Sequence, residues 1–129
     1  MSCSDSIAKL LAEAHFTSCF TKIRPSALDC EEPIVVAEGA FSRGSRLSEE
    51  ERRSVVVTVL VVREVMVDAE SVAVSVELAV RRADWESYAD AGGYRIVGID
   101  IAAPAFKERD SSGRYVWALC VTRTVVRSL

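Results

Sequence analysis

Cysteine and histidine are the side chains of this sequence best suited to metal binding or nucleophilic catalysis. The cysteines are Cys3, Cys19, Cys30 and Cys120, and His15 is the single histidine. A structural zinc ion needs about four closely organised nitrogen or sulfur ligands. No two of these cysteines form a C-x-x-C pair, so we expect no metal site. A catalytic pair of a cysteine with His15 stays formally possible, but the flanking residues do not support it.

Acidic residues and glycines offer little more chemistry. Asp100 lies between two isoleucines of an expected strand, where no second carboxylate or base can be placed. We expect it to pair with an arginine across the sheet. Asp110 begins Asp-Ser-Ser-Gly, which is typical of a turn. Gly92-Gly93 follows an expected helix, whereas a phosphate-binding loop precedes one. The sequence therefore predicts no catalytic and no cofactor-binding residue.

A valine-rich stretch that begins at Ser54 predicts the central strand, residues 54–65. Valine is stiff at χ1 and favours a pleated surface. The odd positions are almost all valine, and the even positions are mixed but still largely apolar. A strand with one solvated face alternates more cleanly. We therefore expect a helix or another subunit to cover the second face as well.

The apolar spacing changes after this strand. From Asp68 to Trp85 the apolar residues recur every three or four positions, which predicts a helix with Asp68 as its N-cap. Gly93 is expected to stop it. Trp85 and Tyr88 lie one turn apart near its end and are expected to close the core or to form a contact patch.

The remaining elements are shorter. Ile7, Leu10 and Leu11 predict an N-terminal helix. Strands are expected at residues 18–23, 33–38, 94–103 and 114–127. The last two are expected to form an antiparallel hairpin. Cys120, in the last strand, is expected to be buried. The order α-β-β-β-α-β-β predicts one α+β domain, residues 1–129, with a mostly antiparallel sheet of about four to five strands and two helices packed on one face.

Charge and hydropathy exclude some classes of function. The net charge of −3 argues against general nucleic-acid binding. The longest apolar run, residues 55–62, is too short to cross a membrane as a helix, so we expect no membrane association. Residues 39–53 are the least apolar segment. Ser48 and the three glutamates after it could cap one helical turn there. Otherwise the segment is expected to form a charged hairpin or an exposed loop, or an arm that contacts a neighbouring subunit.

Several motifs occur in a recognisable order. They are the N-terminal helix, the long strand ending Val-Val-Arg-Glu, the helix 68–85, the strand Gly-Tyr-Arg-Ile-Val-Gly-Ile-Asp, and the turn and strand Asp-Ser-Ser-Gly-Arg-Tyr-Val-Trp. This order resembles the small tail-terminator and head–tail completion proteins of long-tailed bacteriophages. The resemblance covers nearly the whole chain.

The resemblance implies a structural protein of the virion tail and not an enzyme. It implies assembly in the bacterial host cytoplasm into a homo-oligomeric ring, typically a hexamer, whose partners are the tail-tube and head-connector proteins. A head-to-tail contact between subunits would explain a strand with two apolar faces. The residues expected at that contact are Arg43, Arg46, Arg52, Arg53, Val56, Leu60 and Val62.

A second hypothesis comes from a different class of protein. A small α+β enzyme or ligand-binding domain, of unknown substrate, would place a pocket between the helix 68–85 and a curved sheet. It would show a concave site with converging polar groups.

Overall fold

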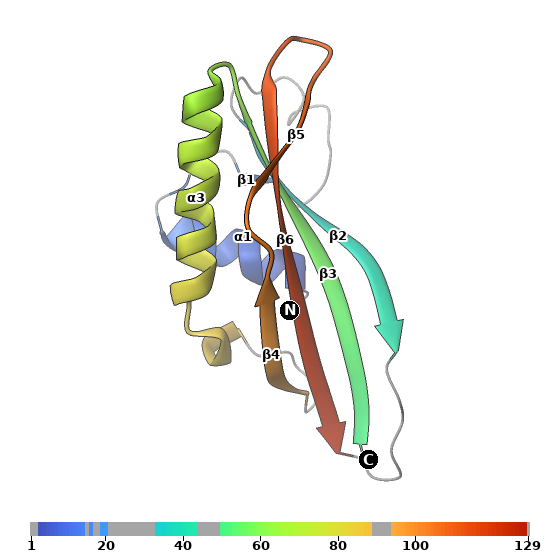
Figure 1. Cartoon of the computed structure of the whole chain (residues 1–129). Helices are drawn as coiled ribbons and strands as arrows, with labels where there is room; N and C mark the ends of the chain where they lie inside the picture. Colours follow the sequence, from blue (N-terminus) through green and yellow to red (C-terminus); the bar gives the residue numbers. More distant parts are fainter. Residues whose placement is uncertain are drawn as a thin grey trace.

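A computed structural model of the chain describes residues 3–14, 16, 19–20, 33–43, 50–88 and 94–128 (Figure 1). Its elements are α1 (Cys3–Glu13), β1 (Cys19–Phe20), β2 (Ile34–Arg43), β3 (Glu50–Arg63), α3 (Met66–Arg82), the 3-10 turn η1 (Trp85–Tyr88), β4 (Arg95–Ile101), β5 (Ala105–Arg109) and β6 (Tyr115–Ser128). The fold is α+β, as expected from the order of elements.

The described strands form one six-stranded sheet in the order β1-β2-β3-β6-β4, with β5 also paired to β6. β1 runs parallel to β2, and the other pairs are antiparallel. β3 and β6 pair along their whole length, from Glu50 opposite Ser128 to Arg63 opposite Tyr115. The predicted hairpin of β4 and β6 is confirmed. β5 was not expected: after Pro104, which cannot donate to the ladder, the chain pairs again with the start of β6.

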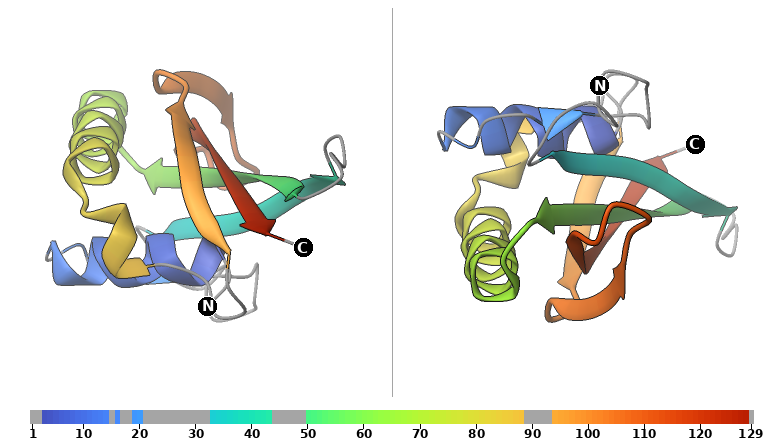
Figure 2. Two further views of the ribbon diagram at one scale, coloured as in Figure 1. Left: turned by 90° about the horizontal axis from the view of Figure 1, so that it is seen from below. Right: turned by 90° about the horizontal axis from the view of Figure 1, so that it is seen from above.

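The hydrophobic core lies between one face of the sheet and the two helices. Figure 2 shows both helices on the same side of β2, β3 and β6, with α1 running across the direction of α3. The predicted alternation of β3 is confirmed, because Val57, Val59 and Val61 are fully buried. Each such burial stabilises the fold by roughly 1.5–3 kcal/mol. The other large contributors are Ile7, Leu11, Ile34, Val36, Val76, Val80, Leu119 and Val121.

The bounds of α3 differ from the prediction at both ends. The N-cap is Val65, which is extended and makes no side-chain capping bond, and Asp68 lies in the first turn. A carboxylate there still interacts favourably with the helix macrodipole. The helix ends at Arg82 because Ala83 is extended, with ψ 143°. Residues 89–93, with the expected stop at Gly93, lie outside the described part of the chain.

Trp85 closes the core after the end of α3. Its indole Nε1 donates a hydrogen bond of 3.0 Å to the carbonyl oxygen of Val80. Its side chain packs against the buried cluster. That bond fastens the η1 turn to the last turn of the helix, in agreement with the expected core-closing role of Trp85.

Most of the charged segment 39–53 is strand and not loop. β2 extends to Arg43, β3 begins at Glu50, and a bulge separates Glu38 from Phe41. Residues 44–49 lie outside the described part. The hydrogen bonds between strands join main-chain groups, so charged side chains do not prevent strand pairing. β2, β3 and β6 therefore extend beyond the part of the sheet that the two helices cover (Figure 1). Of the expected forms, the charged hairpin agrees with the described residues, because β2 and β3 pair as far as Arg43 and Arg53.

Candidate assembly interface

A polar cluster around Tyr94 occupies the sheet where it extends past the helices. The Tyr94 hydroxyl accepts a bond of 3.0 Å from Arg53 and donates one of 3.4 Å to Glu51. Arg127 pairs with the same Glu51 oxygen at 2.8 Å. The guanidinium groups of Arg53 and Arg127 lie 5.2 Å and 4.7 Å from the ring centroid. Cation–π contacts of this kind contribute about 0.5–1 kcal/mol each at exposed sites.

The residues of this cluster lie on the same face of the sheet as the apolar core, beyond the last core valines. Glu51, Arg53 and Arg127 share the face of Val57 by strand alternation. Glu51 is only 5% exposed, and a buried carboxylate is costly unless it is paired. The contacts of Arg127 and Tyr94 with the Oε2 atom of Glu51 offset part of that cost. Arg53, which was predicted at the interface, therefore belongs to a polar network within the single chain.

The opposite face of the sheet, which we call the outer face, carries the other predicted interface residues. Val56, Thr58 and Leu60 of β3 lie there and are partly exposed. Cys120 of β6 lies opposite Thr58 on the same face and is exposed. The expectation that Cys120 is buried is therefore wrong. Its position in an apolar strand pattern did not reveal which face the helices cover.

The predicted interface residues are spread over this face and the hairpin. Arg52 lies on the outer face and is exposed, whereas Val62 is only 7% exposed within the single chain. Arg43 ends β2, where its main chain lies opposite Arg53. Arg46 lies outside the described residues. The outer face therefore brings together Arg52, Val56, Leu60 and Val62 from the predicted set.

The structure also exposes an apolar stripe on α3 that was not predicted as an interface. Val67 is 72% exposed, Val74 41% and Leu78 42%. With exposed Ser71 they follow a spacing of four, three and four residues, which places them on one side of the helix, and we call this set the α3 stripe. The buried side of α3 carries Ala69, Ala73, Val76 and Val80. The signal was present in the sequence as a second apolar series, but only packing shows which series is buried.

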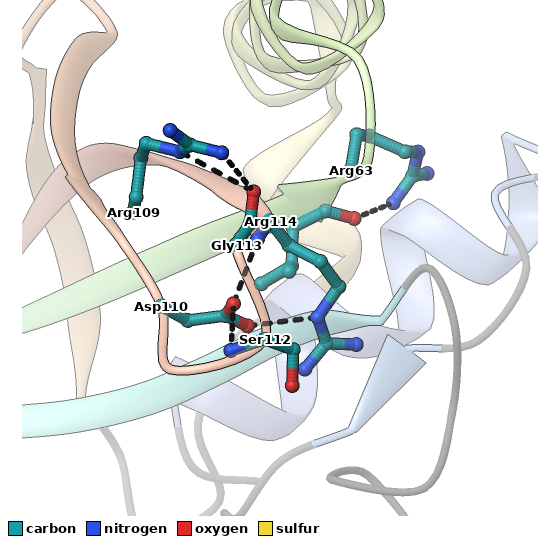
Figure 3. A network of polar contacts seen from close by, with 7 residues as sticks. Arg63, Arg109, Asp110, Ser112, Gly113 and Arg114 are labelled. Atoms are coloured by element: carbon teal, nitrogen blue, oxygen red, sulfur yellow. Dashed lines mark hydrogen bonds and ion pairs between the residues drawn. The ribbon is translucent and has the colours of Figure 1, made fainter.

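The β5–β6 turn is organised by Asp110 (Figure 3). Its Oδ1 accepts main-chain bonds from Ser112 at 3.0 Å and Arg114 at 2.8 Å, and its Oδ2 pairs with the Arg114 guanidinium at 2.7 Å. Burial raises the pKa of Asp110, but the bonds from Arg114 and Ser112 outweigh it and hold the pKa below its ordinary value. Gly113 supplies the positive φ of 80°. The predicted turn role of Asp110 is confirmed.

Asp100 is exposed and lies opposite Thr122. The strand register therefore gives no support to the predicted arginine partner. Among the described residues, which do not include His15, no group of three or more histidine, cysteine or acidic side chains could hold a metal ion. No helix in the same residues is long and apolar enough to cross a membrane.

A hollow of about 300 Å³ lies between the end of β3 and the start of α3. It is lined by Arg63, Asp68, Ser71 and Val72. This volume is at the lower limit of small-molecule sites, which span roughly 300–1,000 Å³. The hollow is open to solvent at the surface of the helix and is not a pocket enclosed between the helix and the sheet.

Comparison with solved structures finds the same fold in a chain from the virion of a native gene transfer agent (GTA) particle. The two chains are 15% identical, the TM-score is 0.68, and the alignment covers 97% of this chain and 95% of that chain. At this identity the likeness establishes a shared fold over nearly the whole length. No protein-family model matches this chain, and no curated protein matches it in sequence.

Proposed function

We propose that this protein is a structural component of a phage-like particle, a tail terminator or tail completion protein that forms a ring at the head–tail junction. The observation that carries the proposal is the fold shared with a chain of a GTA virion over 97% of this chain. The order of sequence motifs supports the same class of protein. Under this proposal the chain has no enzymatic role and is found in the virion tail.

A ring needs a head-to-tail contact between two different surfaces of each subunit. The α3 stripe and the outer face of the sheet meet this requirement, because α3 lies on one side of β3 and the outer face is the other. A hexamer would present one rim to the tail-tube protein and the other to the head-connector proteins.

The test is the assembly state of the purified protein, alone and mixed with the tail-tube protein of the same phage-like particle. Mass photometry and light scattering at micromolar concentration should show a discrete oligomer, and negative-stain electron microscopy should show rings. A protein that stays monomeric under both conditions would remove the main support for the proposal.

The hollow beside Arg63 is the observation that favours the second candidate, a small ligand-binding domain or enzyme. The Arg63 guanidinium and the Asp68 carboxylate both line it, so it would suit a small zwitterionic ligand. The test is a thermal-shift screen with small zwitterionic metabolites, in which a real ligand raises the melting temperature of the wild type but not of Arg63→Ala. No shift for any compound would count against this candidate.

A further inference from the structure

We propose that the α3 stripe of one copy docks on the outer face of the sheet of the next copy, over Val56, Thr58 and Leu60. This inference rests on the proposed ring and names the two surfaces that close it. Each copy would then cover the partly exposed middle of its neighbour's outer face, between Val62 and Val126, which are already buried within the single chain.

The two surfaces match in polarity and length. Between Ser54 and Leu60 the outer-face side chains of β3 are uncharged, and so are the outer-face side chains that pair with them on β6, from Ala118 to Thr124. This band is on the order of 20 Å long at the usual rise of a strand. The α3 stripe from Val67 to Leu78 is on the order of 16 Å long at the rise of a helix. The stripe therefore fits within the uncharged band.

Charges at the ends of the two surfaces are complementary. The outer face carries Arg52 and Arg95 at one end of the band, together with Glu50. The first turns of α3 carry Asp68 and Glu70, both exposed. Within the described residues Arg52 and Glu70 have no ion-pair partner. Docking the acidic start of α3 over the Arg52 end of the band would allow Arg52 and Glu70 to form an ion pair with each other.

The basic end of α3 meets the acidic part of the outer face in the same orientation. Arg82 is exposed in the last turn of α3. Glu108 is exposed on the outer-face side of β5, opposite Val116, at the end of the band away from Arg52. Asp100 is exposed on the same face but lies beside the middle of the band, opposite Thr122. One direction of docking therefore places acid against base at both ends. A symmetric pairing of two α3 stripes would leave the outer face uncovered in both copies.

Cys120 provides a native probe, because it is exposed within the uncharged band. We would introduce Val74→Cys into a Cys19→Ser, Cys30→Ser background and add a short bismaleimide. The expected result is a link between copies that joins the introduced thiol on α3 to Cys120, read by mass spectrometry, and that extends into a ladder of oligomers. Cys120→Ser should abolish the link, and Ser111→Cys in the exposed β5–β6 turn should not form one with Cys120.

The outcomes separate this inference from the proposed function. Discrete rings in which the introduced thiol does not link to Cys120, or links only to the same thiol of another copy, would overturn the docking and leave the ring intact. A protein that is monomeric at every concentration would overturn both.

A charge exchange tests the orientation of docking. Arg52→Glu should weaken assembly about five-fold, as expected for an exposed ion pair that becomes repulsive. Glu70→Arg in the same chain should restore at least half of the lost affinity, measured by mass photometry. A double variant that assembles more weakly than Arg52→Glu alone would overturn the proposed orientation.

Discussion

At the scale of single residues, Tyr94 connects two arginines and a buried carboxylate that belong to two strands, β3 and β6. Its ring contacts the guanidinium groups of Arg53 and Arg127, and its hydroxyl reaches Glu51. Networks of this kind are sensitive to the loss of one member, because a buried charge is then left without full compensation. The end of the sheet that extends past the helices depends on this cluster.

We therefore predict that Tyr94→Phe lowers the free energy of unfolding by about 1 kcal/mol, since it removes the hydroxyl bonds and keeps the ring. Tyr94→Ala should cost about 2–3 kcal/mol, because the cation–π contacts are lost as well. Urea denaturation measures both values. Tyr115→Phe is the control, since the Tyr115 ring lies under Arg109 but its hydroxyl bonds no described residue. Equal losses in Tyr94→Phe and Tyr115→Phe would contradict the role of the hydroxyl.

Asp110 leads to a prediction about pH. Its pKa is lower in the folded chain than its ordinary value. The stabilisation it provides is therefore present above the pKa of the unfolded chain and is lost as the pH falls through the lower folded pKa. Asp110→Ala should lower the free energy of unfolding by about 1–2 kcal/mol at pH 7. The difference from wild type should shrink below about pH 4. A difference that is constant from pH 7 to pH 3, measured by thermal unfolding, would contradict this assignment.

At the scale of elements, Gly39 allows β2 to approach β3 closely beside the bulge. A Cβ at this position would lie 3.0 Å from the carbonyl oxygen of Val56, which belongs to the main chain and cannot rotate away. Gly39→Ala should therefore destabilise the protein by about 1–2 kcal/mol. Gly98→Ala is the matched control, because its new Cβ would meet Thr124 at an ordinary 3.9 Å. We expect a change within about 0.5 kcal/mol there, and the reverse order of the two losses would contradict the close approach.

Helix α3 has two apolar sides with different roles. Val76 is fully buried, whereas Val74 is 41% exposed. Val76→Ala should cost about 1.5–3 kcal/mol of stability through lost burial and a cavity. Val74→Ala should change the stability of the monomer by less than about 0.5 kcal/mol. Urea denaturation of dilute protein separates the two, and similar losses would show that the stripe belongs to the core of the single chain.

At the scale of the whole molecule, assembly should depend on ionic strength. The charges that we place at the ends of the contact are exposed, and salt screens such pairs over about 8 Å at 0.15 M and about 3 Å at 1 M. We predict that the dissociation constant rises several-fold between these concentrations, as measured by mass photometry. Arg52→Gln should assemble more weakly at low salt and respond less to added salt. An unchanged salt response in Arg52→Gln would exclude Arg52 from the contact.

The sequence by itself determined the local features of the fold. Alternation placed Val57, Val59 and Val61 on one face of β3, because successive side chains of a strand point to opposite sides whatever surrounds them. The series at Ala69, Ala73, Val76 and Val80 predicted a helix for the same local reason. Turn chemistry at Asp110 was also readable, because its bonds join residues at most four positions apart.

Only the tertiary structure decided features that depend on distant partners. Strand register put Asp100 opposite Thr122, and the choice of the covered face left Cys120 exposed. The α3 stripe is visible as an unpartnered surface only once the other side of the helix is buried. The charged segment became strand because β6 pairs with β3 as far as Glu50. Each outcome depends on contacts between residues far apart in the chain, and no local pattern of residue types encodes such a contact.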